Sequence, residues 1–193
     1  MTQDIPISHD SDSEEMVTEP KPRFGRAFLT VISTLMFGML IGAIFMATSY
    51  EKGDGLSVYE RQAIEVVTMQ NGITDGWNEM VDTFNVASVT SENEHVILYT
   101  TSQQAARALI SDSQAVINRW RAIDVPEEHA VSHGIGLDAL QTTQDGLILF
   151  DVFFQDAIDT LVADQIRSDE ASDKLVHAQE LWLQAAEAAA NEG

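Results

Sequence analysis

Residues 27–50 read AFLTVISTLMFGMLIGAIFMATSY, a stretch with no charged residue and no proline. Because an α-helix rises about 1.5 Å per residue, residues 27–48 would span roughly 33 Å, enough to cross a hydrocarbon core of about 30 Å. The stretch predicts a single transmembrane helix, which we place at residues 24–50. It separates a short N-terminal tail from a larger C-terminal part.

The charges on either side of this stretch predict its orientation. Lys21, Arg23 and Arg26 precede it, whereas Glu51 and Lys52 follow it. Because basic residues next to a membrane span stay on the cytoplasmic side, we expect the N-terminus inside the cell and the C-terminal part outside. The chain is then a single-pass protein of the cell membrane, held by an uncleaved signal-anchor. A cleaved signal peptide is the alternative, although the apolar run is longer than the usual h-region.

The flanking segments differ in composition from the rest of the chain. Residues 1–23 are polar and acidic, so they bury too little apolar surface to offset their ordering entropy, and we expect a disordered cytoplasmic tail. Residues 51–55, EKGDG, form a short flexible linker because two glycines stand among charges. The remaining residues, 56–193, are long enough for one extracytoplasmic domain.

Small residues recur on one face of the expected membrane helix. Thr34, Gly38 and Gly42 are spaced four residues apart. Such a stripe lets two helix backbones approach closely in a bilayer, where packing holds them together. The lipid bilayer is one expected partner of this helix. A second copy of the chain, forming a homodimer through the small-residue face, is another candidate partner.

The composition excludes some classes of function. From Glu51 onward there are 25 acidic and 7 basic residues, and the whole chain carries a formal charge of −21. Such a chain repels polyanions, so we expect no nucleic-acid partner. The acidity is explained either by solubility or by attraction of cations. The sequence has no cysteine, which excludes disulfides, thiolate metal sites and cysteine nucleophiles.

Apolar residues at alternating spacings of three and four predict helices throughout the domain, and no strand-like alternation persists. The expected fold class is all-α, a transmembrane helix followed by an antiparallel four-helix bundle. Trp77, Trp120 and Trp182 fall on three of the apolar stripes and are expected in the core. The four helices are predicted at residues 56–87, 91–121, 126–166 and 168–192.

Several helix ends have recognisable signals. Ser91 and Glu94 fit a capping box at the start of the second helix. Pro126 is expected at the first position of the third helix, where its missing N–H is not needed. Ser168 is expected to cap the fourth helix. Two pairs inside the first helix resemble turns, Asn71-Gly72 and Asp75-Gly76. The spacing of apolar residues by three and four continues across both pairs.

Asp151 is the polar residue that the pattern makes most conspicuous. It lies within LILFDVFF, residues 147–154, and falls on the predicted core stripe. A buried carboxylate is costly unless it is paired or hydrogen-bonded. One interpretation is a polar layer that fixes helix register, with Arg107 or the amides of Gln144, Gln103 or Gln70 as partner. The other is a ligand-binding or pH-sensing carboxylate in a pocket.

Two histidine patterns are compatible with a divalent metal. His129 and His133 are four residues apart, so they share one helix face. Glu92 and His95 form one Glu-x-x-His, but a second copy, which a di-iron bundle needs, is absent from the sequence. The competing interpretation is that these histidines have a structural role. We expect no cofactor.

Nucleophile elbows, P-loops and nucleotide-binding glycine fingerprints are absent from the sequence. We therefore expect a non-enzymatic bundle that binds a ligand or protein, such as an accessory subunit of an envelope complex. A ligand-sensing domain that relays its signal through a partner is an alternative. A metal-binding or redox bundle is a further one.

Overall fold

The computed structural model describes residues 56–192, and in this part of the chain every regular element is helical. This confirms the predicted all-helical class and agrees with a four-helix bundle. Four long helices and one short 3₁₀ turn follow one another: α3 (Val58–Val86), α4 (Glu92–Arg121), η2 (Glu127–His129), α5 (Ala130–Thr160) and α6 (Gln165–Glu192).

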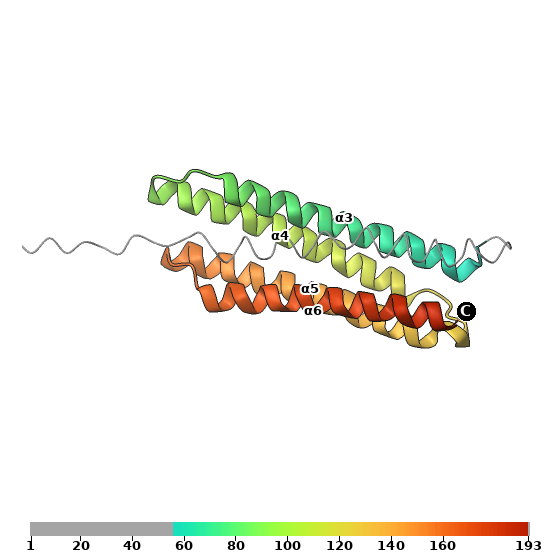
Figure 1. Cartoon of the computed structure of the whole chain (residues 1–193). Helices are drawn as coiled ribbons and strands as arrows, with labels where there is room; N and C mark the ends of the chain where they lie inside the picture. The colour runs from blue at the N-terminus through green and yellow to red at the C-terminus, as the bar shows by residue number, and fades with distance from the viewer. Residues whose placement is uncertain (1–55, 193) are drawn as a thin grey trace, which may run out of the picture.

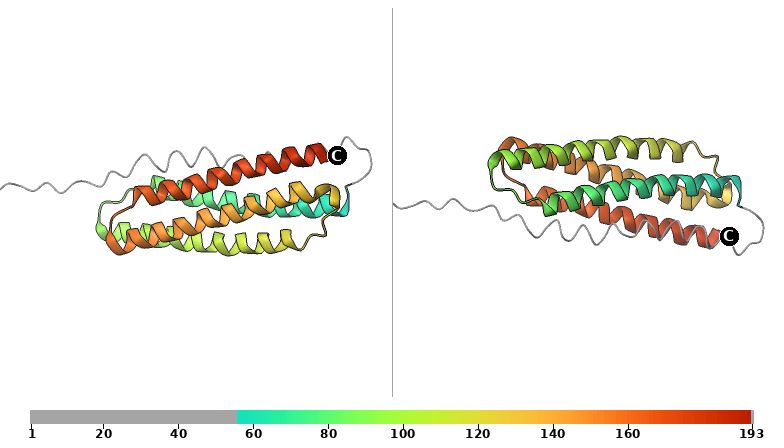
Figure 2. Two further views of the ribbon diagram at one scale, coloured as in Figure 1. Left: turned by 90° about the horizontal axis from the view of Figure 1, so that it is seen from below. Right: turned by 90° about the horizontal axis from the view of Figure 1, so that it is seen from above.

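Consecutive helices run in opposite directions and lie side by side (Figures 1 and 2). α5 packs against both α4 and α6, and α3 packs against α4. The start of α3 and the end of α6 therefore lie at the same end of the bundle, which we call the proximal end (Figure 1). The α3–α4 and α5–α6 connections lie at the opposite, distal end.

The expected tail, membrane span and linker at residues 1–23, 24–50 and 51–55 lie outside the described residues, as does the Thr34, Gly38 and Gly42 stripe. Among residues 56–192, the helices are not apolar enough over sufficient length to cross a membrane.

Capping boxes start both helices of the first hairpin. The Ser91 hydroxyl accepts from the Glu94 backbone N–H, and the Glu94 carboxylate accepts from the Ser91 backbone N–H, as predicted. Ser57 and Glu60 form the same reciprocal pair before α3, which we did not predict. α3 continues without interruption through Asn71-Gly72 and Asp75-Gly76, the two pairs that resemble turns in the sequence.

The predicted boundary between the third and fourth helices is wrong. α5 ends at Thr160 because Leu161 adopts a left-handed conformation, with φ 56° and ψ 18°. α6 begins at Gln165 because the Asp164 carboxylate accepts hydrogen bonds from two backbone N–H groups of its first turn. Ser168, the expected cap, is buried inside the helix.

The start of the third helix also differs from the prediction. Pro126 has an extended backbone, with φ −60° and ψ 149°, and precedes the 3₁₀ turn. The Pro126 carbonyl accepts from the His129 N–H at 2.9 Å, and α5 begins only at Ala130. Pro126 thus caps a tighter turn and does not occupy the first position of an α-helix.

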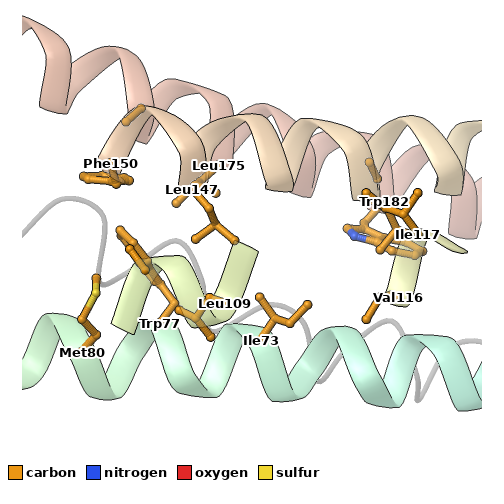
Figure 3. Packing of buried hydrophobic residues seen from close by; sticks show 14 of the residues in the cluster. Ile73, Trp77, Met80, Leu109, Val116, Ile117, Leu147, Phe150, Leu175 and Trp182 are labelled. Atoms are coloured by element: carbon orange, nitrogen blue, oxygen red, sulfur yellow. The ribbon is translucent and has the colours of Figure 1, made fainter. Parts of the chain in front are cut away.

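Aromatic side chains in the core connect the α3–α4 hairpin to the α5–α6 hairpin. Trp77 of α3 lies against Phe150 of α5, with ring centroids 4.4 Å apart (Figure 3). Nearer the distal end, Phe84 contacts both Tyr99 and Phe154. The three tryptophans are buried, as expected.

The buried face of α5 matches the predicted stripe only in part, because Leu140, Leu147 and Phe154 are buried but other stripe residues are not. The stripe placed Gln144, Asp151 and Leu161 in the core, but Gln144 and Asp151 are half-buried and Leu161 is exposed. Because α5 packs against two neighbouring helices, its buried face is wider than a single stripe and takes in further residues. These include Ser132, Gly136, Ala139, Thr143, Gly146, Phe150, Phe153 and Ala157.

Two glycines near the start of α5 have opposite surroundings. A Cβ added at Gly136 would lie 2.7 Å from Cζ2 of Trp120, so glycine is required there for α4 and α5 to approach. A Cβ at Gly134 would meet no atom within 4 Å. Only one of the two glycines therefore serves packing.

We expect Gly136→Ala and Gly134→Ala to change stability in opposite directions. At position 136 the methyl group forces the Trp120 ring to move, which should cost about 1–3 kcal/mol. At position 134 alanine should stabilise the helix by about 0.5–1 kcal/mol, because glycine loses more backbone entropy on folding. Chemical denaturation of the purified chain measures both. A Gly136→Ala variant as stable as the wild type would contradict the assigned packing role.

Candidate functional site

An ion pair joins α4 and α5 on the surface of the bundle. Arg107 Nε donates to Asp151 Oδ1 at 2.7 Å, so the structure brings together two of the residues singled out from the sequence. The Asp151 side chain is 25% exposed and that of Arg107 is 54% exposed. The carboxylate is therefore not the enclosed core group that the pattern indicated.

Glutamine amides extend this contact along the same helix pair. Gln103 donates to the Asp151 backbone carbonyl at 3.3 Å and to Gln155 Oε1 at 3.0 Å. Gln144 donates to the Ile110 carbonyl at 3.4 Å and to Gln114 Oε1 at 3.2 Å. Gln144 does not join Asp151. These bonds connect side chains across the two helices and hold their register.

The second group of polar residues closes the proximal end. The His129 ring stacks on Tyr59 with centroids 4.6 Å apart and an interplanar angle of 9°. The His133 ring stacks on Trp120 at 4.5 Å and 7°. Trp120 Nε1 also donates to the His133 backbone carbonyl at 3.0 Å. The two histidines thus stack on different rings, from α3 and from α4, and the His133 ring also lies 6.0 Å from the Tyr59 ring at an angle of 53°.

Glu192, in the last turn of α6, reaches the first turn of α5. Its carboxylate accepts from the Ser132 backbone N–H at 3.0 Å and from the Ser132 hydroxyl at 2.6 Å. His129 Nδ1 lies 3.4 Å from the same carboxylate. Because the first N–H groups of a helix have no partner within the helix, this carboxylate both satisfies one of them and sits at the positive end of the helix dipole.

The environment of these groups shifts several pKa values. Burial lowers the pKa of His133 from its ordinary 6.5. Burial also raises the pKa of Tyr59 to about 12, while the Ser132 side chain opposes the rise and the Glu192 charge adds to it. Burial tends to raise the pKa of Glu192, but its hydrogen bonds to Ser132 and the contact with His129 outweigh this, so the pKa is lowered overall.

The four candidate metal ligands lie at opposite ends of the bundle. His129 and His133 are at the proximal end, whereas Glu92 and His95 begin α4 at the distal end. Within residues 56–192, no three His, Asp or Glu side chains group closely enough to hold a metal ion. The two histidine patterns named from the sequence therefore lie in separate parts of the fold.

Tyr59, Ser132 and Glu192 were not identified from the sequence. They come from α3, α5 and α6, which are far apart along the chain, so their contacts depend on how these helices pack together. Glu192 ends the alanine-rich α6 helix, and no pattern in the neighbouring sequence predicts its contact with Ser132. Tyr59 lies on the buried face of α3, and its histidine partner belongs to a different segment of the chain.

We expect the stability of the bundle to decline as the pH falls below about 6.5, partly through His133. The pKa of His133 is lower in the folded state than in the unfolded chain, so the unfolded chain binds a proton more readily. The stability that the neutral His133 ring contributes is therefore lost as the pH falls. His133→Phe keeps an aromatic ring against Trp120 and should flatten this decline. Denaturation between about pH 7.5 and 5.5 measures it. An exposed control, His177→Gln, should retain the wild-type slope against which His133→Phe is judged.

We expect Glu192→Ala to loosen the end of α6. Hydrogen bonds to a charged acceptor contribute about 1.5–3 kcal/mol, so the last turn of α6 should exchange its amide hydrogens faster. Glu187→Ala, on the exposed side of the same helix, is the matched control. Equal exchange in the two variants would show that the Ser132 contact does not hold this end.

Searches against known proteins returned no matching family model, no curated relative and no solved structure with significant similarity.

Proposed function

We propose that this chain is a non-enzymatic helical bundle held at the outer face of a cell membrane, where it binds a protein partner as an accessory subunit. The observation that carries the proposal is the uncharged stretch at residues 27–50, which ends a few residues before α3 begins at Val58. A span placed there would hold the proximal end of the bundle close to the lipid surface.

The helix directions support a role in presenting a surface. α5 has 31 residues, so it extends about 46 Å between the two ends of the bundle. A bundle attached at the start of α3 would carry its distal connections away from the bilayer by about that length. Such an arrangement suits contact with another protein of the envelope.

The contacts of the candidate polar residues support a structural role for most of these residues. The Asp151 carboxylate pairs with Arg107, and the Glu192 carboxylate is hydrogen-bonded by Ser132. The His133 ring is covered by Trp120. Each of these groups joins two helices, which favours a binding scaffold over a reaction centre.

The proposal predicts that the full chain stays in the membrane fraction after alkaline carbonate extraction. Protease added outside intact cells should digest the bundle and leave the N-terminal tail protected. Release by carbonate, or protection of the bundle with exposure of the tail, would contradict the proposed anchoring or orientation.

A matched variant tests whether residues 27–50 are responsible. Leu40→Arg with Ile41→Arg places two charges at the centre of the apolar stretch, each costing about 2.5–3.5 kcal/mol for insertion. This variant should move to the soluble fraction. Thr34→Ala, which adds no charge, should remain in the membrane.

A further inference from the structure

The connection between α5 and α6 exposes large apolar side chains at the distal end. Leu161, Val162 and Ile166 are 42%, 66% and 80% exposed. They lie within six residues of one another, in the turn itself and in the first turn of α6. We call these three residues the distal tip.

The backbone of the distal tip is built around an unfavourable residue. Leu161 has φ 56° and is the single non-glycine residue with positive φ among those described. A left-handed conformation is unfavourable for an ordinary residue because its Cβ crowds the following carbonyl, and glycine or asparagine usually occupies this place after a helix. Here the strained position carries an exposed leucine, so the turn combines local strain with apolar exposure.

Acidic residues flank the distal tip along the chain. Residues 156–170 contain Arg167 as the one basic residue and five acids. Arg167 is already paired with Asp156 at 3.2 Å and lies 3.9 Å from Asp164. The remaining acids, Asp159, Asp169 and Glu170, are exposed. The apolar groups of the tip are therefore flanked along the chain by exposed side chains that are mostly acidic.

We propose that the distal tip is the docking surface for a segment of a partner protein that carries lysine or arginine around apolar side chains. An apolar centre with a charged rim is the arrangement of specific protein interfaces, and complementary charge speeds encounter and rejects unsuitable partners. The inference rests on the proposed function, since it names the surface and the chemistry of the partner that the anchored bundle binds.

The charges favour this occupant over a second copy of the chain. From Glu51 onward the chain carries 25 acidic and 7 basic residues, so two copies meeting at their tips would bring like charges together. The distal tip also lies at the end opposite the start of α3, about the length of α5 away (Figure 1). Under the proposed anchoring it therefore faces away from the bilayer.

A photoreactive amino acid at position 162 tests the proposal in the full chain, in membranes of the source cell. Position 131 is the control, because Val131 is the same residue type with 65% exposure and lies at the proximal end. We expect a discrete protein adduct from position 162 and none of the same mass from position 131. Mass spectrometry of the adduct should identify a crosslinked segment with net positive charge.

Two changes should reduce the yield of this adduct. Raising the salt from 0.1 to 1 M shortens the Debye length from about 10 to 3 Å and should lower the yield at least about threefold. Glu170→Lys, with the photoreactive group kept at position 162, should have a similar effect at low salt. A yield unchanged by both would overturn the charge-based docking proposal.

The other outcomes separate this inference from the proposed function. An adduct with a second copy of this chain, with lipid, or with an acidic segment would overturn the assigned occupant. An adduct formed only from position 131 would overturn the tip but retain partner binding by an anchored bundle. Absence of a protein adduct from both positions, with the chain in the membrane fraction, would overturn the tip and leave the anchoring intact.

Discussion

The close approach of Trp120 to Gly136 is the contact on which the packing of the bundle depends most. The indole ring lies where any Cβ would stand, it covers the His133 ring, and its N–H is bonded to the His133 carbonyl. A large rigid group held on three sides sets both the distance and the register of α4 and α5. Trp182 then meets Trp120 edge to face at 6.0 Å, which brings α6 into the same layer. Farther along, the Arg107 and Asp151 pair joins the same two helices.

Polar residues interrupt the apolar core between its two ends. In Figure 3 the labelled apolar side chains gather around Trp77 and Phe150 on one side and around Trp182 and Ile117 on the other. Gln70 and Ser113 are buried between these groups along their helices, and Gln70 Oε1 and Ser113 Oγ have no hydrogen-bond partner in the described structure. Unpaired buried polar atoms cost stability, because they lose their hydrogen bonds to water without replacement. These two buried atoms therefore lower the stability of the bundle.

Local signals predicted the helices well, whereas most contacts between distant segments were not recoverable; the Arg107 and Asp151 pair is an exception. The capping box at Ser91 depends on residues three apart, so the pattern and the structure agree. The end of α5 was misplaced because a leucine with positive φ has no sequence signal, and Asp164 caps α6 in place of Ser168. Asp151 was assigned to the core because a single stripe cannot describe a helix packed against two neighbours. The contact of Glu192 with Ser132 joins residues 60 positions apart and required the whole topology.

The two ends of the bundle differ in their polar and aromatic contacts, although each exposes large apolar side chains, Val58 and Val131 at the proximal end among them. At the proximal end, stacked rings and the Glu192 carboxylate bind α3, α5 and α6 to one another. At the distal end, the α5–α6 turn leaves Val162 and Ile166 in water. Exposed apolar area that the fold does not use lowers solubility, and a chain this acidic counters that cost with charge repulsion. A partner that covers the tip would recover the hydrophobic free energy that folding alone leaves unused.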